Sequence, residues 1–202
     1  MLRLHASKFQ GQQPPTPSQF NHMKNIFRVK EVIHSNLGGR YTAVCLSRDP
    51  TPDEIAQLRR YTRGDAKALA GLPIQRIYHN KNLIPIVGRN VLCRLLADDT
   101  TYSGAVNYGA LGSGTTPFTN LSTELNAEVY RKLKADSDAG DNFAYIDWSI
   151  AAGDVADATY QEFGAFIDGA VGADTGQAFS LLVTGGWVKS GSMFISLKVT
   201  LS

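Results

Sequence analysis

Short runs of alternating apolar and polar residues, separated by turn residues, restrict the fold of this sequence more than any other feature. Four such runs occupy residues 143–150, 162–167, 179–184 and 193–201. The clusters between them are rich in Gly, Asp and Ser, at residues 153–154, 168–169, 172–174, 185–186 and 190–192. Alternation with a period of two is typical of strands that bury one face. The pattern therefore predicts a mainly β chain with an antiparallel β-sandwich or jelly-roll-like domain over residues 81–202.

The stretch YGALGSGTTPF at residues 108–118 resembles a phosphate-binding loop at first sight. Such loops end in Lys followed by Ser or Thr, whereas here Thr115, Thr116 and Pro117 follow Gly114. Proline also lacks the backbone N–H that would face a phosphate. We therefore expect a tight, close-packed turn between elements, in which glycine supplies unusual backbone angles. A short strand over residues 83–90 and a short helix over residues 91–96 are expected before it.

The first 80 residues differ in composition from the rest of the chain and predict an N-terminal arm. Residues 1–25 are polar and rich in proline, so they are expected to be extended. Apolar runs at 27–33 and 41–46, with a turn at 37–39, predict a hairpin within residues 26–50. An arm of this kind gains affinity by covering the surface of a neighbouring subunit.

One helix in the arm has a clear start signal. Thr51 is expected to be its N-cap, Pro52 its first residue and Glu54 the partner in a capping box, and the helix is expected over residues 52–70. Because no set of aromatic residues accompanies its arginines, they predict a solvated or partner-facing surface rather than a nucleic-acid site. The interface residues expected here are Arg59, Arg60, Arg63 and Arg76.

Charge is distributed unevenly along the chain. Residues 1–100 hold 15 Lys/Arg against 7 Asp/Glu, and residues 101–202 hold 5 against 11, which leaves net charges of +8 and −6. Asymmetry of this kind indicates either a nucleic-acid-binding arm or two surfaces of opposite sign that meet in an assembly. We adopt the second interpretation, because it requires no further partner chemistry.

Residue types that carry catalysis or bind metals are scattered. His5, His22, His34 and His79 lack metal-ligand spacing and all precede the β-rich region, so a Ser-His triad there is excluded. The acidic cluster Asp136, Asp138 and Asp141 lacks the closing Glu of a calcium loop and predicts a solvated acidic turn. No metal, cofactor or enzymatic activity is expected.

The chain contains two cysteines and two tryptophans. Cys45 and Cys93 occupy unlike surroundings and predict buried free thiols rather than a disulfide. Trp148 and Trp187 indicate either core or interface anchors or, in a sugar-binding protein, a stacking platform. No apolar run is long enough for a membrane helix, and the N-terminus does not resemble a secretion signal.

Several weak motifs occur in a characteristic order over residues 82–202. They are residues 82–90, ALGSGTTP at 110–117, TEL at 123–125, EVYR at 128–131, QEFGAFID at 161–168 and WVK at 187–189. This succession resembles a widespread group of small structural proteins of tailed bacteriophages, in which an LGTGTTAP turn precedes a TxLxxEVxR segment, an ExGxF strand and a Lys before the last strand. Members are known as tail-fibre, minor tail or virion decoration proteins.

The resemblance implies a virion protein without enzymatic activity. Its domain framework is expected to depend on Gly112, Gly114, Glu128, Arg131, Glu162, Gly164 and Lys189. Glu128 or Glu162 is expected to pair with Arg131 or Lys189, in either a buried or a surface ion pair.

The expected function is a multi-copy capsid-decoration or tail-associated subunit, localised in the virion and anchored by its basic N-terminal arm. Its expected partners are other virion proteins and copies of itself, with no membrane or nucleic-acid partner. The alternative is a receptor- or glycan-binding module of a phage fibre, with Trp148, Trp187 and the acidic turns at a shallow site. A hydrolase of cell-wall sugars is a third hypothesis, which needs carboxylates that converge in a cleft.

Overall fold

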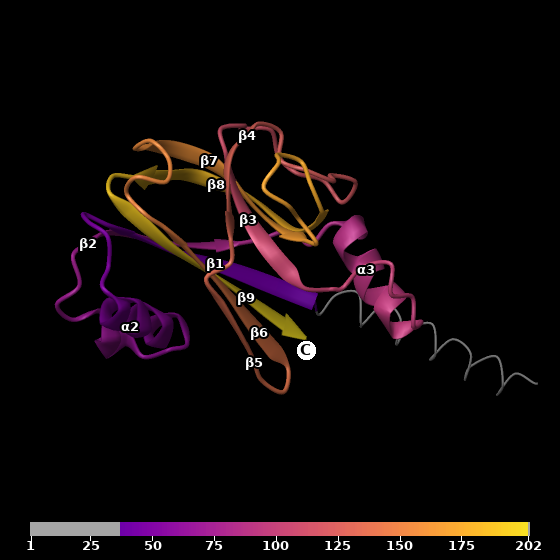
Figure 1. The fold of residues 1–202 in the computed structure, drawn as a ribbon, viewed down its shortest axis with the longest axis horizontal. Helices are drawn as coiled ribbons and strands as arrows, with labels where there is room; N and C mark the ends of the chain where they lie inside the picture. The colour runs from indigo at the N-terminus through magenta and orange to yellow at the C-terminus, as the bar shows by residue number, and fades with distance from the viewer. Residues whose placement is uncertain (1–36, 202) are drawn as a thin grey trace, which may run out of the picture. The chain divides into compact units, whose positions relative to one another are not determined.

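The computed structural model describes residues 37–201, and residues 37–202 form one compact unit (Figure 1). The predicted extended stretch at 1–25, the predicted strand at 27–33 and three of the four histidines lie outside the described residues.

The fold consists of two antiparallel sheets, which confirms the prediction of a mainly β chain and a β-sandwich. The five-stranded sheet has the order β2-β1-β9-β6-β5 and the four-stranded sheet the order β4-β3-β7-β8. The strands are β1 Leu37–Leu46, β2 Ile74–Lys81, β3 Val106–Gly112, β4 Glu128–Leu133, β5 Asp136–Ala139, β6 Phe143–Ile150, β7 Ala158–Ile167, β8 Gln177–Lys189 and β9 Ser192–Leu201. The helices are α2 Pro52–Thr62, the 3-10 turn η1 Ala66–Leu69 and α3 Ile86–Leu96. In Figure 1, α2 and α3 lie at opposite ends of the sandwich.

All four predicted C-terminal strands are present, in β6, β7, β8 and β9. The predicted turn at residues 185–186 is wrong, because both glycines lie inside β8. Gly185 and Gly186 have φ angles of 72° and 98°, at a point where the register between β7 and β8 shifts. Glycine tolerates these left-handed angles, so β8 continues through an irregularity instead of ending.

The predicted boundary between an arm and a domain at residue 80 is wrong. Strand β1 lies between β2 and β9, and its register runs from Leu37 opposite Leu201 to Leu46 opposite Ser192. Residues 37–39 are therefore strand rather than turn. Strand β2, which the sequence pattern did not predict, continues the same sheet. The strands between residues 37 and 81 thus belong to the sandwich itself.

Helix α2 begins as predicted but ends earlier. The Thr51 side chain accepts a hydrogen bond from the backbone N–H of Glu54, and the Glu54 carboxylate accepts one from the N–H of Thr51. The helix ends at Thr62, because Gly64 adopts a φ of 113° and Asp65 caps a separate 3-10 turn. Leu58 is buried against the outer face of the five-stranded sheet, among Val44, Leu46 and Phe194.

Helix α3 replaces most of the strand predicted at residues 83–90. Only Leu83 makes a β-bridge, to Leu181, and Pro85 then serves as the N-cap of the helix. Gly88 lies against β8 so closely that a Cβ atom there would be 2.8 Å from the carbonyl oxygen of Phe179. This close approach lets α3 pack on the backbone of the strand.

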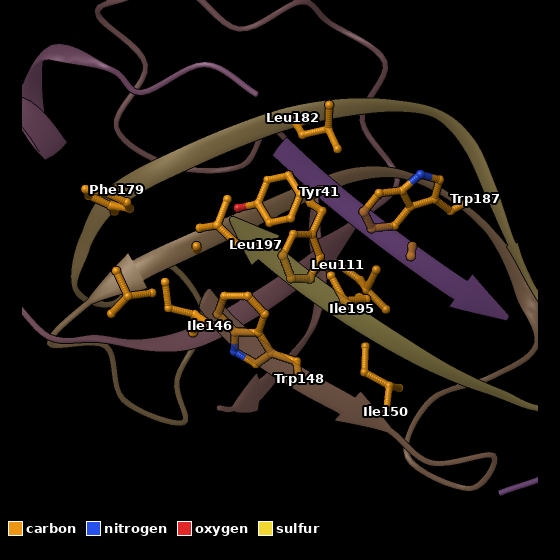
Figure 2. Close-up of a cluster of buried hydrophobic side chains, with 14 of the residues drawn as sticks. Tyr41, Leu111, Ile146, Trp148, Ile150, Phe179, Leu182, Trp187, Ile195 and Leu197 are labelled. Atoms are coloured by element: carbon orange, nitrogen blue, oxygen red, sulfur yellow. The ribbon is translucent and has the colours of Figure 1, made fainter. Parts of the chain in front are cut away.

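Aromatic side chains, packed among aliphatic ones, fill the space between the two sheets (Figure 2). Phe163 lies at the centre of this group, with ring centroids 5.0 Å from Tyr41, 5.4 Å from Trp148 and 5.6 Å from Trp187. Both tryptophans are 0% exposed, so they are core anchors and the sugar-stacking platform is wrong. Trp187 donates a 3.0 Å hydrogen bond from Nε1 to Oδ1 of Asn80, which satisfies its polar atom inside the core.

The two cysteines differ in exposure. Cys45 is buried as predicted, and burial raises the pKa of its thiol to about 11. Cys93 is exposed, contrary to prediction, because it lies on the outer side of α3.

Candidate functional site

The Gly-rich segment makes room for a buried carboxylate. Gly109 and Gly112 lie in β3, so a turn over this whole stretch is wrong. A Cβ at Gly112 would be 2.6 Å from Oε2 of Glu162, and one at Gly114 would be 2.5 Å from Oε1. Neither Gly112 nor Gly114 has a positive φ angle. Close packing rather than an unusual backbone angle therefore requires glycine at 112 and 114.

Glu162 in turn holds the loop that follows β3. Its carboxylate accepts hydrogen bonds from the backbone N–H groups of Asn126, at 3.2 Å, and Ala127, at 3.1 Å, and also from the Asn126 side-chain amide. No ion-pair partner for Glu162 occurs within residues 37–201. The loop between β3 and β4 is thus fixed by Glu162 through hydrogen bonds, and the predicted pairing of Glu162 with Arg131 or Lys189 is wrong.

Glu128 and Arg131 form the buried ion pair that was one of the predicted alternatives. Arg131 donates two hydrogen bonds to the carboxylate, of 2.6 and 2.7 Å, and only 3% and 4% of the two side chains is exposed. The remaining guanidinium nitrogen donates to the carbonyl oxygens of Ala170 and Thr175 and to the Thr175 hydroxyl. Arg131 therefore anchors the loop between β7 and β8 to β4.

Lys189 holds a third loop. Its ammonium donates hydrogen bonds to Oδ1 of Asp157, at 2.9 Å, and to the carbonyl oxygens of Ala152 and Val155, at 3.2 and 2.9 Å. These partners all lie in the connection between β6 and β7. Gly164, the last of the expected framework residues, packs beneath Phe166, 2.9 Å from where its Cβ would lie. The framework residues thus act at separate places in the fold and do not converge on one site.

The arginines of α2 do not behave as one group. Arg59 contacts Asp136 at 3.1 Å and Asp147 at 3.6 Å, while Arg63 contacts Asp147 at 3.1 Å and Asp138 at 3.7 Å. Arg59 and Arg63 thus contact carboxylates of their own subunit, because β5 carries Asp136 and Asp138 to the helix. The predicted acidic turn is only partly correct, since Asp136 and Asp138 lie in a strand, but Asp138 and Asp141 are exposed.

The other two expected interface arginines remain at the surface. Arg60 and Arg76 are both exposed, and within the described part of the chain neither forms an ion pair.

Asp147 is the centre of this contact between α2 and the sheet. It is 0% exposed and accepts a 2.6 Å hydrogen bond from the Ser196 hydroxyl on β9. Burial raises the pKa of Asp147 above its usual range, against the opposing effects of Ser196 and of the two arginines. The Asp147 carboxylate therefore joins α2, β6 and β9 through charge-assisted hydrogen bonds.

Cross-strand rows divide the outer face of the five-stranded sheet into regions of different chemistry. Strand register places Ile77, Val44 and Phe194 in an apolar row, and α2 covers this region through Leu58. The next row contains His79, Thr42, Ser196 and Asp147. His79 links it to the helix, since its ring nitrogens lie 3.1 Å from the Thr42 hydroxyl and 3.2 Å from that of Tyr61.

The third row is cationic and borders a hollow beside the end of α2. Arg40 lies directly opposite Lys81 on one neighbouring strand and opposite Lys198 on the other. The hollow has a volume of about 620 Å³, and its polar lining includes all three cations together with Thr42, Asn82 and Thr200. No local sequence pattern predicts this cationic row, because β1 and β9 lie at opposite ends of the described residues.

Other kinds of site are not found in the described residues. Within residues 37–201, no three His, Cys, Asp or Glu side chains are arranged to hold a metal ion. Neither helix of this region has the length and apolar character needed to cross a membrane. Comparison of the chain with protein-family models, curated proteins and solved structures finds no match.

Proposed function

We propose that the chain is a structural subunit of a tailed-bacteriophage virion, present in multiple copies as a capsid-decoration or tail-associated protein and without catalytic activity. The observation that carries this proposal is how the motif residues are used. Glu162, Arg131 and Lys189 each hold a different loop with buried polar contacts. Motifs of this kind preserve a shape, whereas the motifs of an enzyme bring reactive groups together at one point.

The segment proposed for attachment to the particle is shorter than the sequence alone suggested. Residues 37–81 contribute strands to the sandwich, so we assign attachment to residues 1–36. This segment contains five Lys/Arg and one Asp/Glu. A basic segment of this kind is suited to an acidic surface on a neighbouring subunit, where opposite charge speeds association and selects the partner.

Localisation in the virion tests the proposal. The chain is tagged at its C-terminus and expressed from the genome that encodes it, and tailed particles are purified on a density gradient and labelled with gold for electron microscopy. We expect the tag at the same position on every particle, in a constant ratio to the major capsid protein. Complete, infectious particles without the tag, with the tagged chain left in the particle-free fraction, would contradict the proposal.

A further inference from the structure

We propose that the hollow on the outer face of the five-stranded sheet is an anion-binding site for a compact ligand that carries at least two phosphate or carboxylate groups. The site is formed by the cationic row of Lys81, Arg40 and Lys198, which come from β2, β1 and β9. This inference does not depend on the proposed virion function.

Three adjacent cations lie in this row without an acidic partner among the described residues. Arg40 is opposite both lysines, all three residues are exposed, and none of them forms an ion pair with another residue of 37–201. By contrast, Arg59 and Arg63, a short distance along the same face, have aspartate partners. Residues 1–36, which precede the described residues, contain five Lys/Arg and only one Asp/Glu. This segment is therefore itself basic.

The cationic row lowers the stability of the sheet. Like charges directly opposite each other on neighbouring strands destabilise a sheet. The neighbouring row on the same strands, with Thr42 opposite Ser196, has no such repulsion. Because the cationic row opposes folding, a bound anion that neutralises it would offset that repulsion.

The dimensions of the hollow fit a small ligand with several oxyanion groups. Adjacent strands are separated by about 4.8 Å, so the three cations extend over roughly 10 Å, enough for two or three linked oxyanion groups. Thr42, Thr200 and Asn82 line the same hollow and add neutral hydrogen-bonding groups. The volume of about 620 Å³ suits a small ligand. Arginine binds both phosphate and carboxylate through its planar guanidinium group, so the site suits either group.

The aromatic residues beside the hollow favour an anion over a ligand that binds by stacking. Lys198 lies over the rings of Tyr145 and Phe143, with Nζ 5.4 and 5.6 Å from their centroids, and Arg63 lies 4.7 Å from the Tyr145 centroid. Cations thus occupy the faces on which a base or a sugar would stack. The same contacts hold the Lys198 ammonium beside the hollow.

Titration calorimetry of the full-length chain with tripolyphosphate and with citrate tests the site. We expect both to bind at low ionic strength and to bind more weakly as salt is added. The double variant Arg40→Gln/Lys198→Gln should bind the tighter of the two at least about tenfold more weakly, since each removed group is a charged hydrogen-bond donor. The ratio of the two affinities shows whether phosphate or carboxylate is preferred.

Lys67→Gln is the matched control, because Lys67 is exposed on η1 and its side chain has no hydrogen-bond or ion-pair partner among the described residues. It should bind as the unchanged chain does. The ligand-free double variant should unfold at the same temperature as the unchanged chain or higher, because like-charge repulsion has been removed. Equal binding by the double variant and the unchanged chain, or absence of binding by both anions, would overturn the proposal.

Discussion

Arg63 donates a hydrogen bond of 3.1 Å from Nη2 to Oδ2 of Asp147, a residue 84 positions further along the chain. Arg63 belongs to the basic half of the sequence and Asp147 to the acidic half. Part of the charge asymmetry along the chain is therefore neutralised inside one subunit, where α2 packs on the five-stranded sheet. The sequence predicts that opposite charges also meet between subunits. Such contacts would involve charged residues that have no ion-pair partner within their own subunit.

Substitution of Asp147 tests the importance of this contact. Asp147→Asn keeps the shape of the side chain but removes the charge that Arg59 and Arg63 share. Because burial opposes this charge and raises the pKa of Asp147, we expect a small loss of about 1 kcal/mol in the free energy of unfolding. Both arginine side chains are partly exposed, so water solvates their charges and limits the loss of stability. Urea denaturation followed by circular dichroism measures it. Asp141→Asn, at an exposed position without a side-chain hydrogen bond or ion pair to the described residues, should change stability little.

Glu128→Gln should be more damaging, because Arg131 is almost completely buried. The variant leaves the guanidinium charge without its carboxylate partner, and we expect a loss of about 3 to 5 kcal/mol. Arg131 would keep its contacts to Ala170 and Thr175, so the fold should remain native. Glu124→Gln, an exposed position in the preceding loop, provides a control of the same chemistry. Equal stability of the two variants would mean that the buried pair contributes nothing.

Gly112→Ala and Gly114→Ala test the steric explanation of the Gly-rich segment. Each Cβ would lie within 2.6 Å of the Glu162 carboxylate, and at Gly112 also 2.8 Å from the carbonyl oxygen of Ala127. We expect each substitution to cost about 1 to 3 kcal/mol by overpacking. At Gly153 a Cβ would meet nothing within 4 Å, so Gly153→Ala should be neutral or slightly stabilising. If all three substitutions have the same effect, close packing is not what requires glycine.

Stability should decrease in acid partly through Glu54. Hydrogen bonds from Arg48 and from the Thr51 backbone lower the pKa of Glu54 to about 2. Because the folded-state pKa lies below the usual glutamate value of about 4.3, this contribution is complete above that value and is lost as the pH falls toward 2. Glu54→Gln should therefore be less stable than the unchanged chain at neutral pH, and the difference should shrink as the pH is lowered. Arg48→Gln should reproduce most of the loss, and a difference that grows in acid would contradict this explanation.

Local signals in the sequence predict the parts of the fold that neighbouring residues determine. Alternation identifies β6 and β9, and the spacing of Thr51, Pro52 and Glu54 identifies the start of α2, because a strand face and a helix cap are set by residues close in sequence.

Pairing between distant segments is not encoded in this way. Strand β1 lies next to β9 although its residues lie at the other end of the described chain, so its place inside the sandwich was missed. For the same reason, the sequence did not predict the cationic row of the candidate site. The motif residues pointed to Glu128 and Arg131, which are three positions apart, but the row of Lys81, Arg40 and Lys198 exists only once three strands are aligned.

Two truncations distinguish the attachment segment from the domain. Removal of residues 1–80 deletes β1, α2 and all of β2 except Lys81, and with them the buried residues Tyr41 and Leu58. It also leaves β9 without its neighbour β1, so an inner strand becomes an unpaired edge. We expect this shorter chain to be insoluble or unfolded by circular dichroism, whereas the sequence alone had predicted a folded domain.

Removal of residues 1–36 spares every described strand, because β1 begins at Leu37. This truncated chain should therefore be soluble, should unfold cooperatively and should lose the ability to join the particle, since the basic segment is gone. Thermal unfolding and gradient purification of particles measure the two properties separately. If the chain of residues 37–202 is folded and joins particles as well as the full chain does, attachment belongs to the sandwich and not to the N-terminal segment. If it fails to fold, residues 1–36 are part of the domain, and the division at Leu37 is wrong.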